Sequence, residues 1–286
     1  MKTFVKVWLT IALLAIGFGI AILVICFAGG GSFKEVQTYS IEETYQGVKA
    51  VDIQVKVGEV HIVSGDEFGI KGENLTKDSL ESYVKEDGTW VIHEDPGSAF
   101  KVFGIHFSVK QIFWWSDDLK PELTVILPKD FAADNFNLDI GAGTADAQVI
   151  LSRKGEFSVG AGRISMERLE LTEASKFNVG TGSMDIGAII ARDINVDCGV
   201  GKISMNGTVA GESKLECGVG HIDMQLDGNS GDYSYMVECG IGNIKIDDDS
   251  YRSTSGKKII NRNAQNNLNL ECGIGNINIE FNGKVF

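Results

Sequence analysis

The sequence is short of positive charge. Its 286 residues carry 26 Lys and Arg against 39 Asp and Glu, which gives a net charge of −13 at pH 7. Residues 1–30 hold two of the cations, Lys2 and Lys6, and no acid, so the remainder is still more acidic. A surface of that sign repels nucleic-acid phosphates and anionic lipid headgroups. We therefore expect no nucleic-acid partner and no direct adsorption to anionic lipid.

Proline and histidine are also scarce, with 3 and 4 copies. Because 43% of the residues are hydrophobic, the chain is too apolar to be intrinsically disordered and can bury a large core. No nucleophile elbow, catalytic triad or metal-ligand spacing surrounds the histidines, which are His61, His93, His106 and His221. We predict that the protein is not an enzyme and holds no cofactor or metal.

One long apolar run lies near the N-terminus. Val7–Ala28 is 22 residues long, lacks any charged side chain and is long enough to span a bilayer. A secretory signal has a shorter apolar core and a small-x-small cleavage site, which "ICFAGGGS" fits poorly, although Ala28 and the glycines leave cleavage open. The bulky Ile25 before Cys26 disfavours lipoprotein processing. We predict an uncleaved transmembrane anchor.

The lysines fix the expected orientation of that anchor. Lys2 and Lys6 precede the span, and positive charge tends to stay in the cytoplasm. The sequence thus predicts a single-pass protein of the cell membrane, with its N-terminus cytoplasmic and its C-terminal domain extracellular. The expected boundaries are 1–30 for the cytoplasmic stub and anchor, 31–44 for a linker and 45–286 for the exterior domain.

Glycine is abundant, with 35 copies, and much of it recurs in Gly-x-Gly pairs. Successive pairs begin 19, 20, 19, 19, 22 and 33 residues apart, and a period near 20 is typical of stacked repeats. A strand rather than a helix is expected after each pair, so the pairs are structural turns and not a dinucleotide fingerprint. The turn glycines are Gly141, Gly143, Gly160, Gly162, Gly180, Gly182, Gly199, Gly201, Gly218, Gly220, Gly240, Gly242, Gly273 and Gly275.

Apolar and polar residues alternate strictly on both sides of every pair, as in "LECGVGHIDM" from Leu215. Each unit is therefore expected to be a strand, a glycine turn and a second strand, with one apolar face that only stacking can bury. The predicted fold is all-β, a single-stranded β-solenoid of about 19–20-residue rungs, with an irregular opening at 45–130 and repeats at 131–286.

The polar positions between the apolar ones include a row of acids, Asp139, Asp197, Glu216, Glu238 and Glu271. Carbohydrate-active enzymes with β-helix folds use carboxylates along one face, so such an enzyme is the distant alternative. Alternating polar residues on any solvated strand have the same appearance.

Four units carry a cysteine just before the glycine pair, at Cys198, Cys217, Cys239 and Cys272. Rungs stack about 4.8 Å apart, so four thiols in a column span roughly 14 Å and cannot surround one zinc ion. We predict a packed structural column of cysteines, with disulfides between adjacent rungs as the alternative in an oxidising exterior. His221 falls on a turn and is expected to be exposed.

The opening region combines strand patterns with an aromatic segment. Residues 51–66 resemble a shortened unit that begins the stack, Asp87-Gly88 is expected to form a hairpin turn, and residues 121–128 a strand. The stretch from Phe100 to Trp115 is expected either to cap the first rung or to expose aromatic rings for a glycan, a protein partner or the membrane interface. Its candidate binding residues are Phe107, Phe113, Trp114 and Trp115. After Ile246 we expect one rung to be lengthened by a polar loop.

The strand "VDIQVKVGEVHIVSG", the phrase "LTVILP" and the serial "GAG", "GVG" and "GIG" turns together resemble the bacterial putative-adhesin family of domain-of-unknown-function solenoids, over about residues 45 to 280. The resemblance implies a membrane-anchored adhesin or surface-binding module whose partner is a cell-surface glycan or a membrane protein. Some members resemble accessory subunits of envelope-stress sensing complexes, which is the alternative function. The resemblance supplies no site residue.

Overall fold

The computed structural model describes residues 38–76, 78–95, 100–102, 105–107, 120–252, 258–261 and 264–283. These residues form strands and one short 3-10 turn, Ser230–Asp232, and they contain no α-helix, which confirms the all-β class. No helix in this part of the chain is long and apolar enough to cross a membrane. The expected anchor, Val7–Ala28, lies outside the described residues.

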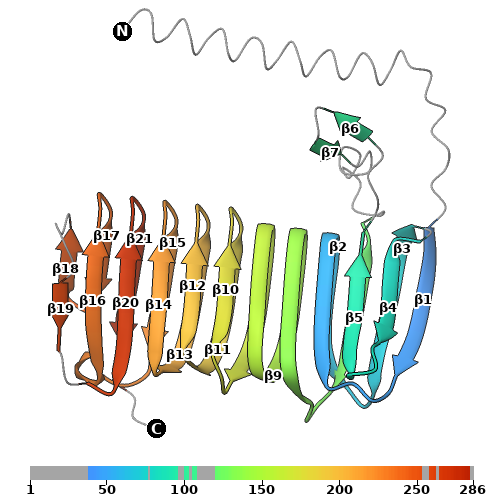
Figure 1. Ribbon diagram of the computed structural model, residues 1–286, viewed down its shortest axis with the longest axis horizontal. Coiled ribbons are helices and arrows are strands. Elements are labelled where there is room, and N and C mark those ends of the chain that lie inside the picture. The colour runs from blue at the N-terminus through green and yellow to red at the C-terminus, as the bar shows by residue number, and fades with distance from the viewer. Residues whose placement is uncertain are drawn as a thin grey trace, which may run out of the picture. The chain divides into compact units, whose positions relative to one another are not determined.

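Most strands pair in parallel and in register, so that each rung lies directly on the next (Figure 1). The fold is therefore solenoid-like, as predicted. In spatial order the rungs are β5 (Thr89–Glu94) with β8 (Glu122–Pro128), β2 (Ala50–Gly65), two successive rungs within β9 (Ala132–Leu171), β10 (Ser175–Val179) with β11 (Ser183–Arg192), β12 (Ile194–Cys198) with β13 (Lys202–Ala210), β14 (Glu212–Cys217) with β15 (His221–Leu226), β20 (Asn266–Cys272) with β21 (Asn276–Phe281), and β16 (Tyr233–Cys239) with β17 (Asn243–Ile246).

The core lies between the inward faces of these rungs. Alternate residues of each strand are buried, and the same position of successive rungs forms an apolar column. In the early rungs Phe136, Phe157 and Phe177 stack with ring centroids 6.1 and 5.3 Å apart. Each fully buried Leu, Ile or Phe side chain contributes about 1.5–3 kcal/mol, so the columns hold the rungs together.

The N-terminal end of the stack differs from the prediction. The unit at residues 51–66 is not the outermost rung, because β5 and β8 pair in parallel with its outer side. Antiparallel strands then cover the end: β4 (Leu80–Val84) pairs with β5, β3 (Phe68–Thr76) with β8, and β1 (Thr38–Tyr45) with β3. The expected hairpin at Asp87-Gly88 is confirmed as β4 and β5. The antiparallel strands protect edges that would otherwise pair with another chain.

The C-terminal end also departs from chain order. The last rung, β20 with β21, lies between β14/β15 and β16/β17 instead of at the end (Figure 1). The expected polar loop after Ile246 is partly wrong, because β18 (Asp249–Arg252) and β19 (Lys258–Ile260) run back antiparallel to β17 and β16. A tight turn at Asp247, whose φ is 47°, reverses the chain. The outermost rung is thereby capped.

Two further strands lie in the aromatic segment. β6 (Phe100–Val102) and β7 (Ile105–Phe107) form a separate antiparallel pair. Trp114, Trp115 and Phe113 lie outside the described residues, so the aromatic cap and the aromatic binding surface both stay predictions.

Candidate functional site

The Gly-x-Gly pairs form one corner of each rung from β9 onward, where the chain passes from the first strand to the second. The backbone ladder continues through this corner: Val219 N donates to Gly199 O at 2.8 Å, and Ile274 N donates to Gly218 O at 2.8 Å. A Cβ on the second glycine would collide with the rung before it, since at Gly220 it would lie 2.3 Å from Gly201 O. Glycine is required here because the backbones approach so closely.

The corners fall into two conformations. In β9 the strand runs unbroken through both corners, and Gly143 and Gly162 adopt φ of 147° and 145°. From Gly180 onward the corner is a bend that separates two strands, and its second glycine has no positive φ. The residue between the glycines is alanine in β9, threonine at position 181, and valine or isoleucine in every later rung.

Those later residues form an exposed aliphatic row, which we call the ridge. Its members, in spatial order, are Val200, Val219, Ile274 and Ile241, with exposed fractions of 62%, 54%, 59% and 80%. They make up four of the six large apolar side chains that are exposed among the described residues. Adjacent rungs are about 4.8 Å apart, so the ridge is about 14 Å long. The flanking glycines carry no side chains that cover it.

A column of four carboxylates runs beside the ridge, which we call the acidic column. It consists of Asp197, Glu216, Glu271 and Glu238, one from each rung that contributes to the ridge. Lys214 approaches it from a neighbouring column, with its Nζ 2.8 Å from Glu216 and 3.6 Å from Glu271. In the earlier rungs the equivalent positions are occupied by Gln54, Asp139, Ser158 and Asn178. The apolar ridge and the dense negative charge therefore begin together.

The other side of the ridge is more nearly neutral. Lys202 and His221 both contact Asp223, at 3.3 and 3.0 Å. The next two rungs place Asn276 and Asn243 at the same position. His221 is partly exposed at the corner. The site thus consists of the apolar ridge, the acidic column on one side of it, and basic, acidic and amide side chains on the other side.

The four cysteines lie inside the same rungs. All are buried thiols outside any disulfide, in the spatial order Cys198, Cys217, Cys272 and Cys239. A hydrogen bond from the Cys217 thiol lowers the pKa of Cys198, and the same bond raises the pKa of Cys217. In the described part of the chain no group of three or more His, Cys, Asp or Glu side chains is arranged to hold a metal ion.

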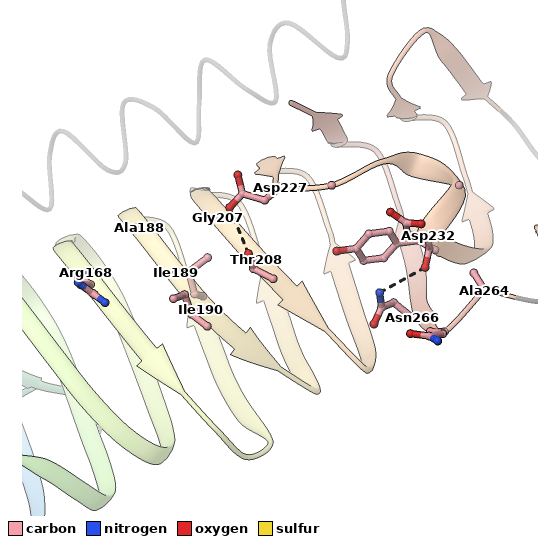
Figure 2. Close-up of a pocket in the computed structure, with 14 residues that line it drawn as sticks. Arg168, Ala188, Ile189, Ile190, Gly207, Thr208, Asp227, Asp232, Ala264 and Asn266 are labelled. Atoms are coloured by element: carbon pink, nitrogen blue, oxygen red, sulfur yellow. Dashed lines mark hydrogen bonds between the residues drawn. The ribbon is translucent and has the colours of Figure 1, made fainter. Parts of the chain in front are cut away.

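A separate groove of about 1010 Å³ lies beside the C-terminal parts of β11 and β13, where β15 has no further residues to pair with them. Residues 189–192 of β11 pair with 207–210 of β13, but β15 ends at Leu226 and the chain leaves through 227–232 (Figure 2). The groove is lined by Arg168, Ile190, Thr208, Asp227, Asp232 and Asn266, among others.

The polar groups of this groove are engaged within the protein. Asp227 accepts from Thr208 at 3.3 Å, and the Asp232 carbonyl accepts from Asn266 at 3.4 Å (Figure 2). Asp227 also accepts from Asn282 at 2.6 Å. Asn282 and Asn266 flank the last rung. The groove therefore holds both ends of β20/β21, and we do not assign it as the binding surface.

The binding residues predicted from the sequence all lie in the aromatic segment. Phe107 lies in β7, and Phe113, Trp114 and Trp115 lie outside the described residues. The ridge was missed, although the change from "GAG" and "GTG" to "GVG" and "GIG" was legible in the sequence. Valine and isoleucine between two turn glycines, at an outward position, were the available signal.

The chain matches one family model and is similar to several solved structures. The family model described as Toastrack DUF4097 matches residues 48–280. Similar solved structures include a putative cell adhesion protein from Clostridium sporogenes, at 15% identity with a TM-score of 0.34, covering 86% of this chain and 100% of that one. Another is a putative adhesin from Bacteroides fragilis, at 14% identity with a TM-score of 0.44, covering 85% and 97%. No curated protein matches the chain.

Proposed function

From the premise that this chain belongs to the Toastrack DUF4097 family, which confirms the resemblance found in its sequence, we propose that it is a non-catalytic binding module whose binding surface is the ridge. The observation that carries the proposal is the alignment of four exposed aliphatic side chains in one ladder. Single exposed apolar residues are common, but a contiguous row marks an interaction site.

The partner is a protein surface with an apolar groove and a basic rim. The apolar groove accommodates the ridge, and Lys or Arg at its rim pairs with the acidic column, Asp197, Glu216, Glu271 and Glu238. Two copies of this protein packed ridge to ridge would bring two acidic columns together, which is unfavourable. Anionic lipid is disfavoured by the same charge.

The module works outside the cell while anchored in the membrane. This part of the proposal comes from the uncharged span Val7–Ala28 and the two lysines before it. An anchored module of this kind serves adhesion when its partner lies on another surface. It serves as an accessory subunit when its partner lies in the same membrane.

The test places a photo-crosslinking residue at position 219 in the full-length protein, expressed in its own cells. We expect a discrete protein adduct that is lost at high salt and in the Glu216→Gln, Glu238→Gln double variant, because the column supplies the charge complementarity. The matched control places the crosslinker at Ile190, which is also an exposed apolar residue but lies at the groove.

Three results contradict the proposal. An adduct of the same yield from position 190, an adduct that is indifferent to the two Gln substitutions, or an adduct only with a second copy or with lipid each excludes the stated partner. The location of the crosslinked protein, in the same membrane or on another surface, then separates the accessory role from adhesion.

A further inference from the structure

The rungs that carry the ridge are also the rungs that carry cysteine. Each cysteine lies two positions before the ridge residue of its rung, with one corner glycine between them, as in Cys217 and Val219. The three preceding rungs have alanine or threonine at the corner, and their inward side chains at the cysteine position are Ile140, Val159 and Val179. Aliphatic side chains thus fill the same place in the core, so packing alone does not require sulfur there.

The four sulfurs form a continuous row of contacts. Their in-register pairs along the stack are Cys198 with Cys217, Cys217 with Cys272, and Cys272 with Cys239. A side-chain hydrogen bond joins the two thiols of each pair. Adjacent strands lie about 4.8 Å apart, which is within the Cα separation of about 4.4–6.8 Å that a disulfide needs, whereas cysteines two rungs apart are about 9.6 Å from each other. Bonds can therefore form between neighbours in the row and not beyond them.

A single pairing uses all four thiols. When only neighbours in a row of four can bond, each end thiol has to bond with the thiol next to it, which gives Cys198 with Cys217 and Cys272 with Cys239. We propose that the column is a site of oxidative modification, at which a peroxide converts the four thiols into these two disulfides and thereby joins the ridge-bearing rungs in pairs. The second disulfide ties the last rung, β20, to the outermost rung, β16. The reaction needs no partner at the ridge, so it is independent of the proposed binding.

A small oxidant approaches the sulfurs at the corners. The second glycine of the neighbouring rung lies over them, since a Cβ on Gly220 would be 2.8 Å from the Cys198 sulfur and one on Gly275 would be 2.7 Å from the Cys217 sulfur. Glycine carries no side chain, so backbone alone covers the sulfurs on this side. Cys272 keeps 5% of its surface exposed. Hydrogen peroxide is small and uncharged enough to use this route.

Cys198 reacts first at its end of the row. The hydrogen bond from Cys217 lowers the pKa of Cys198, and the thiolate is the nucleophilic form. Its attack on hydrogen peroxide breaks the O–O bond and forms an S–O bond, which yields a sulfenic acid and one water. The Cys217 thiol then attacks that sulfur, an S–S bond forms, and the hydroxyl leaves with the thiol proton as a second water. Each disulfide thus removes two electrons from two thiols and reduces one peroxide to two waters. The same steps join Cys272 and Cys239.

The test maps the bonds by mass spectrometry in full-length protein that carries Cys26→Ser, which removes the fifth cysteine of the sequence. Folded, reduced protein is treated with hydrogen peroxide, denatured, alkylated and digested at Asp and Glu, which separates the four cysteines. We expect the two proposed linked peptides at about tenfold or more over any other linked pair, because only neighbours lie within bonding range. Comparable yields of another pair, such as Cys217 with Cys239, which follow each other in sequence but lie two rungs apart, would overturn the proposal. Thiols that stay unlinked, or that become higher sulfur acids without any disulfide, would overturn it as well.

Two matched variants test the order of the row. Val179→Cys places a fifth thiol in register with Cys198, whereas Val159→Cys places one a further rung away. The first variant should form a bond between position 179 and Cys198 and lower the yield of the peptide that links Cys198 to Cys217 about twofold, because two neighbours then compete for one sulfur. The second variant should leave that yield unchanged. Equal effects of the two variants would show that the bonds arise without the order of the folded rungs, and would overturn the proposal.

Discussion

The early corners, in β9, and the late corners, which carry the ridge, lie at the same place in their rungs but expose different side chains. In β9 the corner stays extended, with alanine before a second glycine that adopts a positive φ, and the neighbouring outward column is largely neutral. In the late rungs the corner bends, and valine or isoleucine points outward beside four carboxylates. Under our proposal, the early rungs serve the stack, whereas the late rungs also carry the interaction surface.

Inside the stack the two regions differ as well. Early rungs place Ile140, Val159 and Val179 where late rungs place cysteine. Val179 and Cys217 both lie under the second glycine of the next rung, since a Cβ at Gly201 would be 2.6 Å from Val179 Cγ1 and one at Gly275 would be 2.7 Å from the Cys217 sulfur. Valine and cysteine therefore occupy the same position beneath the corner in the two halves.

The largest effect should come from filling the corner glycines. Gly162→Ala places a methyl group 1.9 Å from Gly143 O and imposes a φ of 145° on alanine, whereas Gly220→Ala meets Gly201 O at 2.3 Å without a positive φ. Overpacking costs about 1–3 kcal/mol, and backbone strain at Gly162 adds about 1–3 kcal/mol. The free energy of unfolding measured in urea should therefore be lower for Gly162→Ala than for Gly220→Ala.

The control for both is Gly231→Ala, because no atom lies within 4 Å of its added Cβ. That variant should unfold within about 0.5 kcal/mol of the parent. If Gly220→Ala were as harmless as Gly231→Ala, close backbone approach would not be the reason for glycine in the late corners.

A smaller effect is expected from Cys217→Val, which gives a late rung the interior of an early one. Because Val179 already fits the equivalent space, the change in unfolding free energy should be less than about 1.5 kcal/mol. The comparison variant is Cys217→Asp, which buries an unpaired charge and should unfold the neighbouring rungs. A loss well above that bound for valine would mean that the thiol does more than fill space.

The order of the rungs could not be predicted from the sequence. Alternation and glycine spacing predicted the strand, the corner and the inward columns, and the hairpin at Asp87-Gly88 was confirmed by β4 and β5. Every rung, however, carries nearly the same motif and the same register, so each is compatible with several neighbours. At both ends the spatial order departs from the chain order, with β5/β8 outside β2 and β20/β21 inside β16/β17.

The ridge escaped prediction for a different reason. Glycine-rich turns indicate architecture, and the sequence pattern predicts the residue between the glycines to be part of the turn. Only burial distinguishes a structural corner valine from one in the ridge. Val57, at the equivalent corner of β2, is buried, whereas Val200 is exposed. A residue type alone does not distinguish these two environments.

The smallest change in stability, and the sharpest test of the comparison, comes from Thr181→Val. Thr181 already has the late corner geometry and lies one rung before Val200, but it presents a hydroxyl, which donates to Gly160 O at 3.2 Å. Because the side chain is exposed, its replacement should alter unfolding by no more than about 0.5 kcal/mol. Valine there lengthens the ridge by one ladder step of about 4.8 Å and should increase the yield of the position-219 adduct. The matched substitution Ile190→Val trims an exposed apolar residue outside the ridge and should leave the yield unchanged. Thr181→Val with unchanged adduct yield would confine the contact to the four late rungs, whereas equal responses to both substitutions would show that general surface hydrophobicity, and not the ordered ridge, controls binding.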